Sequence, residues 1–430
     1  MKALYRAPVI RTARMAGSIA AVAAVMAAAG VTAGQQPTAV ATLLRNPAVK
    51  AALDAARAGE PQTIEQQIHF CEVPAPPFKE ATRAAVLKRA FEELGLHNVH
   101  LDRVGNVLGD RPGASARPRV VVAAHLDTVF PEDTPVKVKR EGSLLRGPGI
   151  GDNCRGLAVL VAAARALGQV GVQTPSTITF VANVGEEGLG DLRGAKELFQ
   201  GEMKGQIDRF VSIDNAGLLI TNRAVGSRRF RVTFKGPGGH SFGAFGLANP
   251  AHALGRAVAK IAEFQVPGQP RTTFNVGRIG GGTSVNAIPF EAWMEVDMRS
   301  SDPDALGSLD ARFHRAVDAA VAEENARWGA RQTVKAVNEL VGDRPVGLTP
   351  ATAPIVLTAQ AVARVLGLDA SLGEGSTDSN VPMSLKIPAI TIGGGGRSSD
   401  SHAPGEAFES TDSWKGTQNA VLLMIALAQP

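Results

Sequence analysis

Acidic residues and histidines recur at, or just past, the ends of apolar strand-like runs in this chain. The segments are AHLDTVF with His125 and Asp127, GDN with Asp152, VGEEG with Glu186 and Glu187, SIDN with Asp214, and SDSHAPGE with His402. Like charges gathered in one place repel each other and shift each other's pKa values, and a bound cation relieves that repulsion. Imidazole and carboxylate together suit Zn²⁺, and Co²⁺ or Mn²⁺ fit the same ligands. The combination predicts two metal ions, bridged by one carboxylate, that activate a water molecule.

Each segment taken alone also has a purely structural explanation. Asp152 precedes a helical run and would serve as an N-cap. His125 and Asp127 also fit a polar turn, and the pair Glu186 and Glu187 fits a solvated loop. The glutamate pair is nevertheless suited to chemistry, because one carboxylate can bind a metal while the other acts as a general base. It is the five segments together that favour a metal site.

The elements that must position these residues are strands buried on both faces. Near-continuous apolar runs cover residues 119–124, 177–184, 209–213 and 389–392, and runs of this kind suit the central strands of a parallel sheet. Helical patterns at 79–94 and 156–168 alternate with them, which predicts an α/β fold with a largely parallel sheet. Ligands of such sheets bind beyond the carboxyl ends of the strands, so residues distant in sequence can meet there.

The pattern changes near residue 221. From 227 to 339 the expected order is strand, helix, strand, strand, helix, strand, which is the order of ferredoxin-like domains. We therefore expect a catalytic α/β domain in two parts, residues 34–222 and 343–430, interrupted by a smaller α+β insert at 223–342. Repeats and low-complexity segments are absent beyond the N-terminal region.

Residues 1–33 have the composition of a secretory signal peptide. Lys2, Arg6, Arg11 and Arg14 precede an Ala/Val-rich run, and the small residues 31–33 resemble a cleavage site. We expect an exported protein, periplasmic or secreted; a permanent membrane anchor is the alternative, because the run is at the short edge for a span. The formal charge of +5 includes these four cations, so removal of the leader leaves +1. Neither nucleic acid nor stable membrane insertion is expected of the processed chain.

The chain has two cysteines, Cys71 and Cys154, which are too few for a disulfide framework. We expect two free buried thiols, although an exported protein could pair them. Cys154 lies two residues after the candidate ligand Asp152, and this spacing allows a thiol near the metals.

The segments, in this order, resemble the di-zinc metallopeptidase family of glutamate carboxypeptidase, acetylornithine deacetylase, aminoacylase and peptidase T-like tripeptidase, from about residue 62 to the C-terminus. The resemblance implies a phosphorylase/hydrolase-like zinc-peptidase catalytic domain, with the insert as a lid that in many relatives also forms a homodimer. It implies two Zn²⁺ per subunit. One would be held by His125, Asp152 and Asp214, and the other by Asp152, Glu187 and His402.

The resemblance also implies catalytic roles. Glu186 would be the general base and Asp127 its supporting carboxylate. His240, in a Gly-Gly-His-Ser segment of the insert, resembles the lid histidine that polarises the scissile carbonyl and that some relatives donate across a dimer. From chemistry alone a glycine loop could present His240 as an oxyanion donor, or it could be a surface turn.

Four further residues match substrate-binding segments of the family. Asn286 lies in the segment Thr-Ser-Val-Asn, and Arg299 ends Asp-Met-Arg, where the family's arginine holds a substrate carboxylate. Gly375 and Thr377 lie in a loop that lines the family's substrate cleft. An arginine at position 299 could form a bidentate pair with a carboxylate, or it could be an exposed strand charge.

Two departures bear on the branch of the family. Many relatives carry a lysine and two glycines soon after the bridging aspartate, whereas this chain has Asn153, Cys154, Arg155 and Gly156. Aspartate rather than glutamate at position 214 points toward the peptidase branches.

We therefore expect a metal-dependent exopeptidase that hydrolyses small peptides. An N-acyl amino acid deacylase with the same site is the nearest alternative. An exported binding protein without catalysis is a further alternative, but the complete set of ligands and base argues against it. A structural zinc site would favour closed, cysteine-rich tetrahedra, which this sequence lacks.

Overall fold

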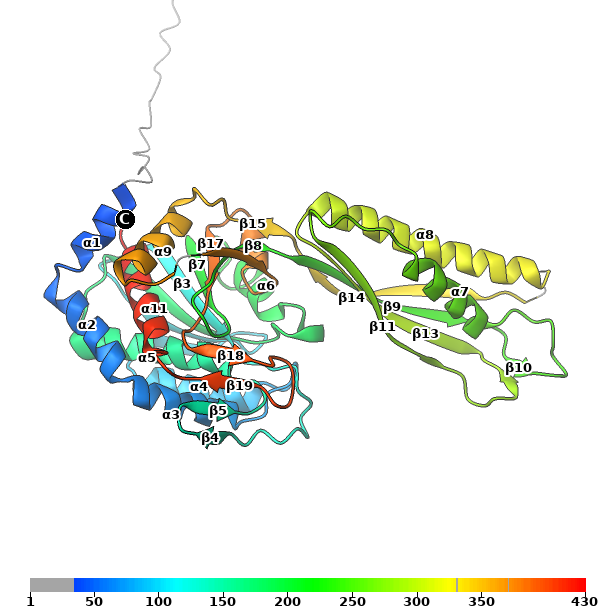
Figure 1. Cartoon of the computed structure of the whole chain (residues 1–430), viewed down its shortest axis with the longest axis horizontal. Helices are drawn as coiled ribbons and strands as arrows, with labels where there is room; N and C mark the ends of the chain where they lie inside the picture. The colour runs from blue at the N-terminus through cyan, green and yellow to red at the C-terminus, as the bar shows by residue number, and fades with distance from the viewer. Residues whose placement is uncertain (1–34, 330–331, 370) are drawn as a thin grey trace, which may run out of the picture.

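The computed structural model describes residues 35–329, 332–369 and 371–430. The expected signal peptide, residues 1–33, lies outside them. Figure 1 shows two bodies joined by extended strands: a main domain that contains both ends of the described chain, and an inserted domain formed by residues 226–344. None of the helices in the described ranges combines the length and apolar character needed to cross a bilayer.

The main domain is built on a nine-stranded sheet. Its strand order is β1-β2-β6-β3-β7-β17-β8-β15, with β16 beside β8. The strands are β1 His97–Leu101, β2 Val107–Arg111, β3 Ser115–His125, β6 Ser176–Asn183, β7 Arg209–Ile213, β8 Ile220–Ala224, β15 Gly347–Leu348, β16 Leu372–Gly375 and β17 Ala389–Ile392. The four central strands β6, β3, β7 and β17 run parallel, whereas β1 and β2 add an antiparallel edge. The expectation of a largely parallel sheet is confirmed at its centre.

Helices cover both faces of this sheet. One face packs against the larger apolar core with helices α2 Pro47–Ala58, α4 Ala81–Glu93, α5 Cys154–Val170, α9 Pro354–Val365 and α11 Trp414–Leu427, and the other face contacts α6 Arg193–Gln200 and α10 Asn380–Ser384. Every residue of β6 is buried, as a strand covered on both sides requires. Ahead of α4 the chain forms three short helices, α1 Gln35–Leu43, α2 and α3 Glu60–Cys71. Asn46 caps α2, and Gly59 separates α2 from α3.

The inserted domain has the expected ferredoxin-like order. Strands β9 Gly226–Lys235, β11 Thr272–Gly281, β13 Glu291–Ser300 and β14 Lys335–Arg344 form an antiparallel sheet in the order β11-β13-β9-β14. Helices α7 Pro250–Ala262 and α8 Pro303–Arg327 pack on one face, where they share a separate apolar core. A short ribbon of β10 Gly239–His240 and β12 Ala287–Ile288 lies at the end of this domain remote from the main domain (Figure 1).

A small four-stranded sheet of the main domain was not predicted. It pairs β4 Lys139–Glu141 and β5 Leu144–Arg146 with β18 Arg397–Ser399 and β19 Ala407–Glu409. Strands of three residues carry too short a pattern to be recognised in a sequence. The sheet brings the loop that contains His402 next to the segment that leads to Asp152.

Both cysteines are free and buried, as expected. They share a small apolar cluster with Ile150 and Phe408. The Cys71 thiol donates to the Pro148 carbonyl oxygen at 3.3 Å, and burial raises the pKa of Cys71.

Candidate metal centre and active site

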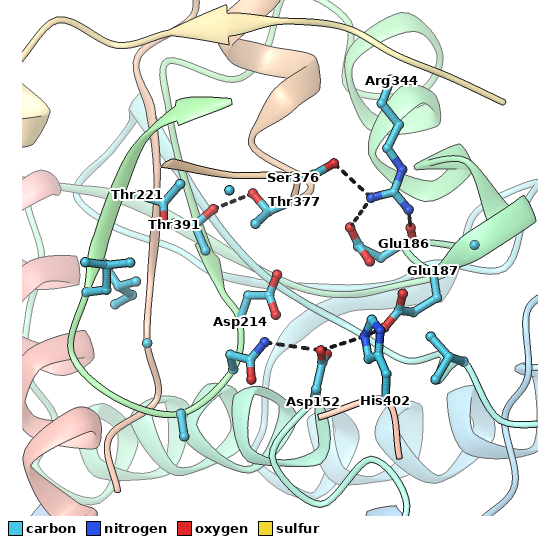
Figure 2. Close-up of a pocket in the computed structure, with 18 of the residues that line it drawn as sticks. Asp152, Glu186, Glu187, Asp214, Thr221, Arg344, Ser376, Thr377, Thr391 and His402 are labelled. Atoms are coloured by element: carbon cyan, nitrogen blue, oxygen red, sulfur yellow. Dashed lines mark hydrogen bonds and ion pairs between the residues drawn. The ribbon is translucent and has the colours of Figure 1, made fainter. Parts of the chain in front are cut away.

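The predicted metal ligands meet at the carboxyl edge of the main sheet. His125 is the last residue of β3, Glu186 and Glu187 follow β6, and Asp214 directly follows β7. Asp152 stands just before α5. His402 comes from the loop between β18 and β19, and Figure 2 shows it facing Asp152 and Glu187 across the same pocket.

Two groups of ligand atoms share Asp152, and a third group, of His125, Glu186 and Glu187, lies beside them. His125, Asp152 and Asp214 form one group, and Asp152, Glu187 and His402 form the other, with the ligand atoms of each group within 4.8 Å of one another. Asp152 Oδ1 lies 3.1 Å from His125 Nε2, and Asp152 Oδ2 lies 3.2 Å from His402 Nε2. Each oxygen of one carboxylate therefore faces a different imidazole, which is the arrangement of a bridging ligand.

Asp127 supports this arrangement from beneath. It is fully buried, and its two carboxylate oxygens accept the backbone N–H groups of Glu186 at 3.0 Å and Glu187 at 2.7 Å. His125 Nδ1 lies 3.0 Å from the Asp127 backbone oxygen, which orients Nε2 toward the ligand cluster. Asp127 thus fixes the imidazole and both glutamates together.

Charges in this cluster shift one another's pKa values. Hydrogen bonds to Asp152 and Glu187 raise the pKa of His402 to about 10. Burial opposes the charged form of Asp152, but His125 and His402 outweigh burial and lower its pKa. Buried carboxylates need a compensating cation, and the raised pKa values of His125 and His402 favour the charged form of both imidazoles beside these carboxylates. A mixed set of imidazole and carboxylate oxygen atoms around one shared carboxylate fits two divalent cations.

Glu186 has a partner that the sequence did not indicate. Arg344, the last residue of β14, donates from Nη1 to Glu186 Oε1 at 2.9 Å and to Ser376 Oγ at 3.1 Å, and from Nη2 to the Glu186 backbone oxygen. Figure 2 shows this guanidinium between Glu186 and Ser376. Burial raises the pKa of Glu186, and Arg344 acts in the opposite direction. The candidate base is therefore held by the strand that returns from the inserted domain.

The cluster opens into a cavity of about 450 Å³. Three of the four predicted substrate-binding residues, Arg299, Gly375 and Thr377, line it. His240 and Asn286 do not: they lie on the distal ribbon, where the Ser241 backbone N–H donates to the Asn286 carbonyl oxygen at 2.9 Å. His240 is exposed there, and its Nδ1 accepts backbone N–H groups of Phe242 and Gly243 at 3.3 Å.

Glu406 was also missed as a supporting residue, although it belongs to the segment SDSHAPGE. Its carboxylate accepts the backbone N–H groups of Gly149 at 3.1 Å, Gly151 at 2.8 Å and Asp152 at 2.9 Å. It therefore shapes the loop that presents the bridging ligand. The only signal in the sequence was an acidic residue four positions after a candidate ligand.

The unusual residues after Asp152 serve packing. Arg155 is fully buried. It donates to Glu60 Oε1 at 2.8 Å and to the backbone oxygens of Gly394 and Ser413 at 2.7 and 2.6 Å. Asn153 caps α5 and also donates to the Ile213 oxygen at 2.9 Å. This departure from the family pattern joins α5 to α3 and α11 and leaves the metal ligands in place.

Comparison with known proteins identifies the family. The model of peptidase family M20/M25/M40 matches residues 121–426, and the chain belongs to this family. It is therefore a hydrolase of a metallopeptidase family. Among relatives, the succinyl-diaminopimelate desuccinylase of Bordetella pertussis is 30% identical over 265 residues, which are 56% of this chain and 69% of that protein. The cytosol non-specific dipeptidase of Escherichia coli is 29% identical over 285 residues, covering 59% and 57%.

Solved structures share the fold. A tripeptidase from Staphylococcus aureus matches with a TM-score of 0.69 at 21% identity, covering 86% of this chain and 98% of that one. A dinuclear metal-binding peptidase of the M20 family from Bacillus subtilis matches with a TM-score of 0.61 at 18% identity, covering 86% and 99%. The main domain and the inserted domain are thus both part of a known architecture.

Proposed function

We propose that this protein is an exopeptidase that hydrolyses small peptides with two divalent cations, Zn²⁺ in the first instance. The observation that carries the proposal is the shared carboxylate: Asp152 turns one oxygen toward His125 and the other toward His402. Two ligand groups around one bridging aspartate are expected of a two-metal hydrolase and are not needed for packing. When bound, such a cation pair supplies the Lewis acid that lowers the pKa of a water molecule.

The chain's own residues provide the proton transfer and the positioning. Glu186 accepts the proton of the attacking water and returns it to the leaving amine. Arg344 holds one oxygen of that carboxylate at 2.9 Å, which leaves the second oxygen for proton transfer. Asp127 fixes the backbone of both glutamates, so base and ligand keep a constant relative position.

Arg299, Gly375 and Thr377 are proposed to hold the substrate, because they line the same cavity as the ligands. His240 and Asn286 are not among the residues that line that cavity, and β10, which contains His240, lies at the far end of the inserted domain (Figure 1). We propose that the inserted domain mediates a homodimer in which each subunit supplies these two residues to its partner. Mixing an inactive Glu186→Gln subunit with an inactive His240→Ala subunit would then restore part of the activity, and a monomeric active enzyme would rule the arrangement out.

A second candidate, an N-acyl amino acid deacylase, is favoured by the charges of the cavity. The acidic residues that line it are Asp152, Glu186, Glu187 and Asp214. Asp152, Glu187 and Asp214 belong to the two groups that share Asp152, and Glu186 pairs with Arg344. Among the described lining residues no carboxylate is left to bind a free amino group, which suits a substrate whose amine is acylated.

The test is a panel of dipeptides, tripeptides and N-acyl amino acids. The wild-type protein would be assayed as purified, after chelation, and after restoration with Zn²⁺, Co²⁺ or Mn²⁺, with metal content measured in parallel. Activity that is lost on chelation and restored by one metal supports the proposal, and the preferred substrate decides between peptidase and deacylase. A protein with two bound metals that turns over no member of the panel would contradict it.

Export of the protein also stays a proposal, supported by the composition of residues 1–33. N-terminal sequencing of the mature protein from a bacterial expression host tests it. A mature chain that begins near residue 34 supports export, and retention of residues 1–33 argues against it.

A further inference from the structure

The wall of the cavity contributed by the inserted domain is rich in arginine. Arg229 on β9 and Arg299 on β13 both line the cavity, together with Arg344 at the end of β14. Arg344 is already paired with Glu186. Among the residues that the structure describes, the other two cations share one carboxylate, Asp297, which leaves one positive charge uncompensated next to the metal ligands.

Both arginines donate a hydrogen bond from their Nε atom to Asp297. Its Oδ1 accepts from Arg229 Nε at 2.9 Å, and its Oδ2 accepts from Arg299 Nε at 2.7 Å. Asp297 is the direct cross-strand neighbour of Arg229, and Arg299 lies two residues further on the same face of β13. Since a guanidinium has five N–H donors, both arginines keep terminal N–H groups that can bind another anion.

Arg229 is placed close to the reacting centre. Its Nη1 donates to the Gly188 carbonyl oxygen at 2.6 Å, one residue beyond the ligand Glu187. Gly342 on β14 is paired with Arg229, and a Cβ atom at that position would lie 3.1 Å from Arg229 Cδ. Because Gly342 has no side chain, the Arg229 side chain has room to reach the Gly188 carbonyl oxygen.

We propose that Arg229 and Arg299 together select a substrate with two carboxylates. One would bind the carboxylate adjacent to the scissile amide, and the other an acidic side chain, so that the released amino acid is an aminodicarboxylic acid. Two bidentate arginine–carboxylate pairs at a fixed spacing recognise a diacid by geometry as well as by charge. The inference rests on the proposed amide hydrolysis and adds the substrate class, with Asp297 as a positioning residue.

The test compares substrates that differ only in the second charge. The metal-loaded full chain would be assayed with N-acetylglutamate against N-acetylglutamine, and with glycylglutamate against glycylglutamine. A desolvated pair of charged groups predicts kcat/KM for the acid about tenfold or more above that for the amide. In Arg229→Gln this ratio should fall toward one.

Arg231→Gln is the matched control. Arg231 lies two residues further along β9, pairs with Glu295 at 2.7 Å and stands outside the cavity lining. It should leave the acid-to-amide ratio as in the wild type. Equal turnover of acid and amide by the wild type would overturn the proposal. An equal loss of kcat/KM for the acid and the amide in Arg229→Gln would also overturn it, because Arg229 would then act through its contact with the Gly188 carbonyl oxygen and not through the second carboxylate of the substrate.

A binding measurement separates this inference from the proposed function. Calorimetry of the metal-loaded protein with glutamate and glutamine does not depend on turnover. If no substrate is hydrolysed but glutamate binds more tightly than glutamine and loses that advantage in Arg229→Gln, the proposed function fails and the diacid site stands. If substrates are hydrolysed and glutamate has no advantage, the diacid site fails alone.

Discussion

The main sheet and the sheet of the inserted domain use their faces in opposite ways. The main sheet is buried on both sides, and every residue of β6 is buried. The sheet of the inserted domain is covered on one side only, and along β13 buried residues alternate with partly exposed ones. Side chains for chemistry therefore leave the main sheet at the ends of its strands, whereas the inserted sheet presents them along an open face.

The difference follows from the cost of burying charge. A carboxylate in the middle of a strand such as β6 would be desolvated without a partner, so the ligands follow the strands. On the open face of the inserted sheet, Arg229, Asp297 and Arg299 can stand side by side, because one flank of each remains near solvent. Acidic metal ligands and cationic substrate contacts thus come from different kinds of sheet.

The largest expected effect is at the end of a main-sheet strand. Glu186→Gln removes the base while it keeps the shape of the side chain, and kcat should fall by about 10²–10⁴-fold, with metal content unchanged by elemental analysis. Glu295→Gln, on the inserted sheet, loses surface pairs with Arg231 and Arg278. It should change kcat by less than about twofold. A comparable loss in both variants would abolish the distinction between the two sheets.

The second effect is on stability, measured by urea unfolding. Arg155→Met leaves Glu60 buried without its cation and should lower the free energy of unfolding by about 3–5 kcal/mol. The control, Arg228→Met, breaks a partly exposed pair with Asp310 in the inserted domain and should cost at most about 1 kcal/mol. An equal loss of unfolding free energy in both variants would show that burial does not explain the contribution of the Arg155–Glu60 pair to stability.

The two faces of the inserted sheet can be tested against each other. Leu309→Ala, in the buried core under α8, should destabilise this domain by about 2–5 kcal/mol. Val337→Ala changes a residue of β14 that pairs with Thr233 on the open face of the sheet and is 51% exposed, and it should change stability by no more than about 0.5 kcal/mol. Calorimetry would show an earlier transition in the first variant only. Metal binding should persist in both, since the ligands come from the main domain.

The smallest expected effect is a pH dependence of the metal-free protein. Burial raises the pKa of Glu406 from 4.5 to about 7, although hydrogen bonds from Asp152, Gly151 and Gly149 favour its charged form. The folded protein therefore binds this proton more tightly than the unfolded chain. The resulting stabilisation is complete below pH 4.5 and is lost as the pH rises through about 7.

Glu406→Gln should flatten the stability of the metal-free protein across that pH window, as measured by urea unfolding at several pH values. Asp378, whose pKa burial also raises to about 7, contributes a slope of the same sign in both proteins. The difference between the two curves therefore isolates Glu406. An unchanged slope in the variant would assign the pH dependence to other groups.

The residues at the strand ends could be predicted from the sequence because the pattern that indicates them spans only neighbouring residues. A continuous apolar run such as 177–184 followed by two glutamates indicates both a buried strand and the position of its end. Polar and apolar residues alternate along 227–235, and this alternation likewise separated the half-buried strands of the inserted domain from those of the main domain. The candidate ligand segments and the order of the large elements followed from patterns of this length, whereas the division of the ligands between two metals was implied by the family resemblance.

Contacts between distant segments were decided only by the tertiary structure. Arg344 meets Glu186 across 158 positions, and Arg155 meets Glu60 across 95. His240, Asn286 and Arg299 have comparable motifs, but only Arg299 reaches the cavity of its own subunit. Local sequence determines where a strand ends and which face of it is buried, because both depend on neighbouring residues. Which charges finally share a site depends on how separate sheets pack, and that is set by the folded chain as a whole.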